Sequence, residues 1–144
     1  KLPKIIISLI SVPFYLSETV YFTLSVTFIY VAINKAGKTI GFASGKSSDD
    51  ENFNGELYSL YLLQECRGLG IGRELVSAIA KHFRAKGITS MMVWVMKQNK
   101  SGLGFYERMG GKEYLRRKSE FGEVVVDDVA YGWEDVSVLC LEEK

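Results

Sequence analysis

The chain has 144 residues, 47% of them hydrophobic and 24% charged, with a formal net charge of +1. This composition is typical of one folded domain with a core and excludes a disordered chain. The balance of charges gives no electrostatic reason to expect nucleic acid as a partner. Two cysteines and one histidine form no metal-ligand pattern, so we expect no metal, no disulfide framework and a cytoplasmic location.

Residues 1–26 are unusually apolar and carry only three charged side chains. Their apolar run after two lysines is compatible with a signal peptide or a membrane anchor. Pro13 and Glu18 interrupt the run, however, and it is shorter than the roughly 20 residues of a membrane-spanning helix. We therefore expect buried core segments within a single domain of residues 1–144, with a strand near residues 4–10 and no membrane. Because residues 1–26 are so apolar, this front segment would also suit a homodimer interface.

Three segments before residue 64 have the composition of β-strands, because they are rich in aromatic, β-branched and leucine residues. A short turn with glycine at its tip separates the first two, and a polar, acidic loop precedes the third. The expected strands are residues 27–34, 39–45 and 56–63, the turn is 35–38 and the loop is 46–55.

A helix is predicted to end near residue 86, because apolar residues recur there at spacings of three and four and Gly87 follows as a stop signal. The residues of this apolar face are Leu75, Val76, Ile79, Ala80 and Phe83. The next segment, residues 88–96, is apolar throughout, which is typical of a strand buried on both faces. A helix between two such strands predicts a crossover between parallel neighbours.

A short helix over residues 101–109 and a long hairpin complete the chain. Gly110 and Gly111 end the helix, and the residues that follow divide into two strands at Phe121–Gly122. The order of strands, helix, strand, short helix and hairpin predicts a mixed α/β sheet.

The segment CRGLGIGRELV places three glycines between the predicted strand and the predicted helix. A helix N-terminus has unpaired N–H groups and a partial positive charge, so an anion can lie against a backbone that carries no Cβ atoms. Arg67 and Arg73 flank the glycines and can add charge-assisted hydrogen bonds to a phosphate. The alternative is a tight turn that needs Gly68, Gly70 and Gly72 for its own geometry. The glycines alone leave both interpretations open.

Two common phosphate loops do not fit this segment. A P-loop requires lysine and then serine or threonine after its last glycine, whereas Arg73 and Glu74 follow Gly72. The dinucleotide-binding fingerprint requires a different glycine spacing and an acidic residue at the end of the next strand. The residues at that strand end are Lys97, Gln98 and Asn99.

Two motifs together resemble the GNAT superfamily of acyl-CoA-dependent N-acyltransferases. Arg67, Gly70 and Gly72 match the form Q/R-x-x-G-x-G/A, and NKSGLGFYERMGG, residues 99–111, matches N-x-x-(small)-x-x-F-Y-E-x-x-G. The resemblance covers residues 27–134. It implies the acyl-CoA N-acyltransferase fold, a mixed, mostly antiparallel twisted sheet with a βαβ crossover and splayed central strands.

The resemblance also implies acetyl-CoA as co-substrate. The glycine loop would hold the coenzyme A pyrophosphate, the strand before it would pair with the pantetheine arm, and Asn99 would contact the cofactor near the short helix. The implied cofactor-binding residues are Leu60, Tyr61, Leu62, Leu63, Arg67, Gly68, Leu69, Gly70, Ile71, Gly72, Arg73, Asn99 and Tyr106.

The same resemblance nominates two catalytic residues. Tyr106 matches the family tyrosine that gives a proton to the departing thiolate, and Glu56 is placed like the strand glutamate that serves many members as general base. A backbone N–H near Leu62 would polarise the thioester carbonyl. Each side chain also has a simpler interpretation, Glu56 as a solvated charge where a strand begins and Tyr106 as an aromatic residue on the core face of a helix.

Three functions remain open on the sequence alone. The first is an N-acetyltransferase that moves an acetyl group from acetyl-CoA to a small amine or a protein amino group by direct attack in a ternary complex. The second is a catalytically impaired acyl-CoA-binding module, because residues 1–26 show no polar-faced helix of the kind that builds the acceptor wall in family members. The third is a nucleotide-binding domain that uses the same glycines.

Overall fold

The computed structural model describes residues 6–10 and 27–142. The strand expected near residues 4–10 is confirmed as β1, Ile6–Ile10. The rest of the apolar front, including the question of a helix there, lies outside the described residues. Within the described part of the chain, no helix is long and apolar enough to cross a membrane.

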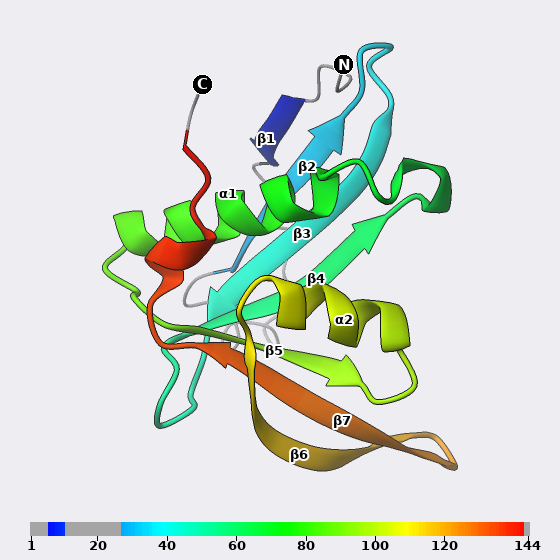
Figure 1. Ribbon diagram of the computed structural model, residues 1–144, viewed down its shortest axis with the longest axis vertical. Helices are drawn as coiled ribbons and strands as arrows, with labels where there is room; N and C mark the ends of the chain where they lie inside the picture. Colours follow the sequence, from blue (N-terminus) through cyan, green and yellow to red (C-terminus); the bar gives the residue numbers. More distant parts are fainter. Residues whose placement is uncertain (1–5, 11–26, 143–144) are drawn as a thin grey trace, which may run out of the picture.

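One twisted sheet of seven strands forms the described part of the protein, and two helices lie on the same face of it (Figure 1). The strand order is β1-β2-β3-β4-β5-β7-β6, and β4–β5 is the only parallel pair among these strands. The remaining bounds are β2 Thr27–Ile33, β3 Thr39–Ser47, β4 Gly55–Leu62, α1 Ile71–Ala85, β5 Met91–Met96, α2 Lys100–Arg108, β6 Lys112–Phe121 and β7 Val124–Trp133, with a 3-10 turn at Val136–Leu139. This confirms the mixed, mostly antiparallel sheet with a βαβ crossover.

Two element boundaries differ by two residues or more from those expected. Strand β3 continues to Ser47, because β2 and β4 pair with it on both sides beyond residue 45, and the acidic loop is correspondingly shorter. Strand β5 begins only at Met91, because the Ile88 N–H is bonded to the Phe83 carbonyl at 2.9 Å and still belongs to the C-terminal turn of α1. Apolar composition alone could not separate that helix-ending turn from the strand after it.

Helix α1 covers the middle of the sheet through one apolar stripe. The five residues predicted for its apolar face are all fully buried. They pack against inward-facing residues of β4 and β5 such as Leu57 and Val93. The crossover therefore fixes where β4 ends and where β5 begins, and so positions the region between them.

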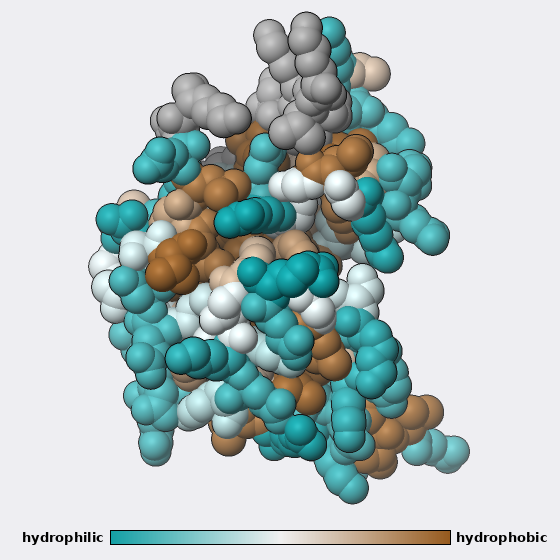
Figure 2. All heavy atoms as spheres, in the orientation of Figure 1, coloured by the Kyte–Doolittle hydropathy of each residue, from teal (hydrophilic) through white to brown (hydrophobic). Residues whose placement is uncertain are grey.

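The β6–β7 hairpin extends beyond the rest of the sheet, and its tip carries exposed apolar side chains (Figures 1 and 2). Phe121, Val124 and Val125 are each more than half exposed. Nothing in the described part of the chain covers them. The homodimer interface expected at the apolar front, residues 1–26, lies mostly outside the described residues and stays a prediction.

Candidate active site

The central strands β4 and β5 run side by side for only three residues. Gly55, Glu56 and Leu57 pair with Met91, Met92 and Val93, after which no residues of the two strands pair. Strand β4 continues to Leu62 and keeps its pairing with β3 on the other side. The β3–β4 register shifts at this point, so that Tyr58 is an extra residue in β4, and a bulge of this kind bends and twists a strand. The two strands therefore form the arms of a V.

A cleft of about 670 Å³ occupies this V and continues along α1 and α2. It unites elements far apart in sequence: the separated part of β4, the glycine loop, β5 and the exposed turns of α2. Its walls are formed by Tyr58, Ser59, Leu60, Leu62, Arg67, Gly68, Gly70, Gly72, Arg73, Val93, Trp94, Val95, Met96, Asn99, Ser101, Gly102, Phe105, Tyr106 and Arg108. Nine of the residues that the sequence nominated for cofactor binding thus lie on one cleft.

Strand β4 directs free backbone groups into the cleft. The N–H of Leu63 is bonded to the Ile40 carbonyl of β3 at 2.9 Å. Because backbone groups of successive strand residues point to opposite edges, those of Leu62 and Leu60 point toward β5. Strand β5 does not pair with them there, so their N–H and C=O groups are available to a ligand.

The loop before α1 requires glycine for its backbone conformation. Gly68 and Gly70 have φ angles of 79° and 83°, in the left-handed region that other residues avoid, and a Cβ atom at either position would meet no other atom within 4 Å. The tight-turn and anion-binding interpretations of the loop are therefore compatible, because the turn that needs these glycines also leaves open space beside its backbone for a ligand. Gly70 precedes the first turn of α1, and no side chain caps that helix end. The first N–H groups of α1 can donate hydrogen bonds to an anion.

Three arginines surround the glycine loop within the cleft. Arg67 and Arg73 lie there as expected, and Arg108 reaches the same cleft from the last turn of α2. None of the three forms an ion pair with a described residue. Sequence reasoning missed Arg108, because the second motif leaves its position, two residues after Tyr106, unspecified.

Tyr106 is buried, yet it reaches the cleft. Its side chain is 6% exposed, and its ring packs edge-on against Phe105 and Trp133, with centroids 5.1 and 6.0 Å away. Tyr106 lines the cleft, and its hydroxyl forms no hydrogen bond with any residue that the structure describes. Burial raises the pKa of this phenol well above its usual value, so the proton stays on the oxygen at neutral pH. The core-face and cleft-facing interpretations of Tyr106 therefore both apply.

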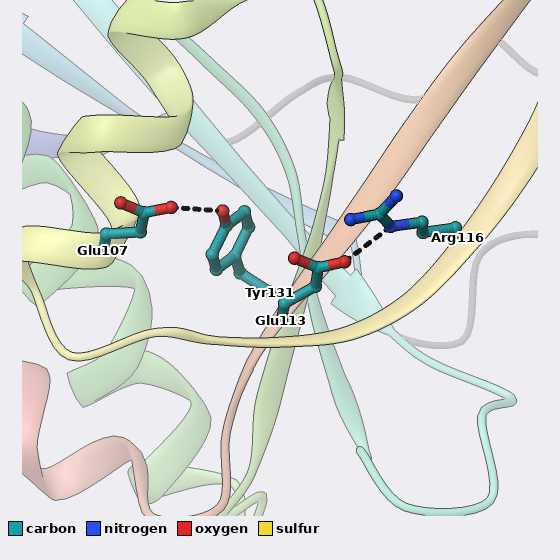
Figure 3. Close-up of polar contacts among 4 residues, drawn as sticks. All are labelled: Glu107, Glu113, Arg116 and Tyr131. Atoms are coloured by element: carbon teal, nitrogen blue, oxygen red, sulfur yellow. Dashed lines mark hydrogen bonds and ion pairs between the residues drawn. The ribbon is translucent and has the colours of Figure 1, made fainter.

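Helix α2 is anchored at both ends, which fixes the position of Tyr106. The Asn99 side chain accepts a hydrogen bond from the Gly102 N–H at 2.9 Å and so caps the helix. The Tyr131 hydroxyl donates to Glu107 at 2.7 Å and ties the helix to β7 (Figure 3). This hydrogen bond, with burial, raises the pKa of Tyr131 to about 12. Figure 3 also shows the separate pair of Glu113 and Arg116 at the start of β6.

Glu56 lies beside the cleft and does not line it. It lies in the part of β4 that pairs with both neighbouring strands, opposite Met92 of β5 and Lys46 of β3. The bulge at Tyr58 is two residues further along the strand. Desolvation raises the pKa of its half-buried carboxyl, and the positive charges of Lys46 and Arg117 act in the opposite direction. This position suits a general base that takes a proton from an amine in the V, through a water or after a movement of its side chain. The role of Glu56 as general base stays a prediction.

Four other nominated residues also lie off the cleft. Tyr61 is half exposed and stacks on Phe42 with ring centroids 5.8 Å apart, and Leu69 is exposed. Ile71, the first residue of α1, is buried in the core, and Leu63 packs on the core while its N–H bonds to β3. In the described ranges no three His, Cys, Asp or Glu side chains are grouped to hold a metal.

A model of the acetyltransferase (GNAT) family matches residues 11–111, more than two thirds of the chain. The chain belongs to the GNAT acetyltransferase family. Its fold agrees with that of a family acetyltransferase from Elizabethkingia anophelis determined with acetyl-CoA bound, with a TM-score of 0.67 over 89% of this chain and 96% of that one. Sequence identity to that protein is 14%, so the likeness shows the fold alone.

Two curated relatives are more similar in sequence. The chain is 36% identical over 113 residues to the uncharacterized N-acetyltransferase YuaI of Bacillus subtilis, a match that covers 77% of this chain and 65% of YuaI. It is 33% identical over 84 residues to the L-methionine sulfoximine/L-methionine sulfone acetyltransferase of Pseudomonas aeruginosa, covering 57% of this chain and 49% of that protein. The chain thus spans less than two thirds of the length of either relative.

The glycine loop gives a first testable prediction. Gly70→Ala forces alanine into the left-handed region at a cost of about 1–2 kcal/mol and displaces the first N–H groups of α1. We expect Gly70→Ala to lower stability and to weaken coenzyme A binding, measured by calorimetry. Gly37, with φ 82° in the turn between β2 and β3, is the matched control, because Gly37→Ala should cost similar stability and leave binding unchanged. Equal affinities for the two variants would contradict this role of the loop.

The half-buried carboxyl of Glu56 gives a second prediction, concerning pH. As pH rises through the interval between the ordinary pKa and the raised folded-state pKa, the unfolded chain loses a proton that the folded chain keeps. The folded wild type is thereby destabilised relative to Glu56→Gln. Urea unfolding of both proteins should show the variant gaining stability over the wild type as the pH rises above 4.5, the ordinary pKa of the carboxyl, through the interval up to its raised pKa. A difference that shrinks with rising pH would show that Glu56 is stabilised as the anion.

Proposed function

We propose that the protein is an N-acetyltransferase that moves an acetyl group from acetyl-CoA to a primary amine by direct attack. The observation that carries the proposal is the V between β4 and β5, with free backbone groups on one arm and the unpartnered Tyr106 hydroxyl beside it. A helix N-terminus and three unpaired arginines lie at the outer end of the same cleft. Residues 1–144 would act as one domain in the cytoplasm.

The residues present fit acetyl-CoA. An extended pantetheine arm carries amide groups, which the free N–H and C=O groups of Leu60 and Leu62 can bind as a further strand would. The pyrophosphate requires N–H donors and positive charge, which the start of α1, Arg67 and Arg73 offer together. Arg108 adds a third charge for the phosphates. When bound, acetyl-CoA supplies an activated acyl group as a thioester.

The chain's own groups would then act at three places. A free N–H of β4 that the pantetheine arm leaves unused would donate to the carbonyl oxygen, where negative charge develops when the amine nitrogen attacks the carbon. The Tyr106 hydroxyl, which is protonated at neutral pH, would give its proton to the sulfur as the carbon–sulfur bond breaks. Glu56 would take the proton that the amine loses on forming the amide. Most of the remaining acceleration comes from holding the two substrates together.

A direct test replaces the Tyr106 hydroxyl alone. We expect Tyr106→Phe to lower kcat for coenzyme A release by about 10²–10⁴-fold, the usual contribution of a general acid, with little change in KM for acetyl-CoA. Thiol release from acetyl-CoA with a panel of amines measures both constants.

Tyr61→Phe is the matched control, because this tyrosine lies on β4 with an exposed ring outside the cleft and should retain full activity. A Tyr106→Phe variant as active as the wild type would remove the general-acid role. Stabilisation by ATP or NAD and none by coenzyme A would instead favour the nucleotide-binding alternative.

A further inference from the structure

The face of the sheet opposite the helices carries two cation–aromatic contacts at the mouth of the V, one on each strand. On β4, the ring of Tyr58 has the Lys46 ammonium 4.3 Å from its centroid. On β5, the ring of Trp94 has the Arg117 guanidinium 3.9 Å from its centroid. Tyr58 and Trp94 are the first residues of each strand after the pairing stops, and both line the cleft. Each arm of the V thus holds one cation beside the opening.

Glu56 lies on the same face as these cations. Lys46 is its cross-strand partner in β3, and Met92 is its partner in β5, two residues before Trp94. Since strand residues alternate between faces, Glu56, Lys46, Met92 and Trp94 share one face, and Leu57 and Val93 point to α1 on the other. Lys46 and Arg117 both act electrostatically on the Glu56 carboxyl. The candidate base therefore lies between two positive charges.

Both cations retain donors for a ligand. Lys46 forms no ion pair with a described residue. Arg117 uses its Nε to reach Asp128 at 3.2 Å, and Asp128, which is buried, also accepts a hydrogen bond from the Ser119 hydroxyl at 2.6 Å. This contact holds the guanidinium over the Trp94 ring, and its terminal nitrogens form no hydrogen bond with a described residue. The arrangement positions a planar donor beside the V.

One carboxylate of the nearby acidic loop is engaged within that loop. The Asp50 carboxylate accepts hydrogen bonds from the Asn52 N–H at 2.8 Å and the Tyr114 hydroxyl at 3.4 Å. Asp50 therefore stabilises its own loop. Among the described residues at the mouth of the V, the Lys46 ammonium forms no ion pair and Arg117 is paired through its Nε with Asp128, so two cations are positioned to bind an anionic group.

We infer that the acceptor is an amine that carries a carboxylate on or near its amine-bearing carbon, as an α-amino acid does, and that Lys46 and Arg117 bind this carboxylate. The inference rests on the proposed acetyl transfer. With the carboxylate held between the two cations, the amine is directed to the opening of the V, where Glu56 and the thioester meet. The carboxylate also replaces the negative charge between the cations when Glu56 takes the proton from the amine.

The test compares amino acids with the amines that lack only their carboxylate. The pairs are L-leucine with 3-methylbutylamine, L-phenylalanine with 2-phenylethylamine, and L-methionine with 3-(methylthio)propylamine. Thiol release at saturating acetyl-CoA gives kcat/KM for each. We expect the ratio of amino acid to amine to exceed one in the wild type for at least one pair. Lys46→Met should lower that ratio about tenfold through KM, as expected when one charge-assisted hydrogen bond is lost.

Two further variants separate binding from folding. Lys38→Met removes an exposed lysine in the turn between β2 and β3 and should leave the ratio unchanged. Arg117→Met would leave Asp128 buried without its cation, so it is combined with Asp128→Asn, which retains an acceptor for Ser119. This double variant should lower the ratio as Lys46→Met does.

The outcomes distinguish the inference from the proposed function. Acetylation of the amines with ratios at or below one, or ratios unchanged in Lys46→Met and in the double variant, would overturn the carboxylate-binding role while leaving acetyl transfer intact. No coenzyme A release with any amine or amino acid would overturn both. Comparing ratios between proteins removes the difference in basicity between the two kinds of amine.

Discussion

The rest of the site depends on one constraint, which is that β4 and β5 pair for three residues and then part. A parallel pair of this kind needs a crossover, and α1 supplies it by burying its apolar stripe on the sheet. The bulge at Tyr58 then carries β4 away from β5 while its pairing with β3 continues. The result is a sheet whose middle is open, with a helix N-terminus at one end of the opening.

The same separation gives the two faces of the sheet different tasks. On the helix side, the cleft contains the glycine loop, the arginines and the Tyr106 hydroxyl, all suited to a phosphate-bearing thioester. On the other side lie Glu56 and the two cation–aromatic contacts, suited to a small charged amine. The two substrates would therefore approach the V from opposite faces and meet where the strands part. The Asn99 cap and the Glu107–Tyr131 hydrogen bond anchor α2 and so fix the position of Tyr106, the proposed acid.

The fold and the cofactor side of the site could largely be predicted from local patterns. The helical spacing of apolar residues in α1, the glycines before it and the motif around Tyr106 each depend on neighbours in sequence, and the structure places them together. The cation pair could not be predicted, because Lys46 and Arg117 are 71 positions apart in sequence and become neighbours of Glu56 only through strand register. The start of β5 was misplaced because the last turn of α1 is as apolar as the strand. Arg108 was missed because a lone charged residue on a helix carries no pattern.

The most direct test of this account is amide hydrogen exchange on β4 with and without coenzyme A. Leu60 and Leu62 direct their N–H groups into the V, whereas the Leu63 N–H is already bonded to β3 and serves as an internal control. The account predicts that saturating coenzyme A slows exchange at Leu60 and Leu62 strongly, together with the first residues of α1, and leaves Leu63 unchanged. Unaltered exchange at Leu60 and Leu62 in the saturated protein would show that the ligand does not lie along the open arm of β4.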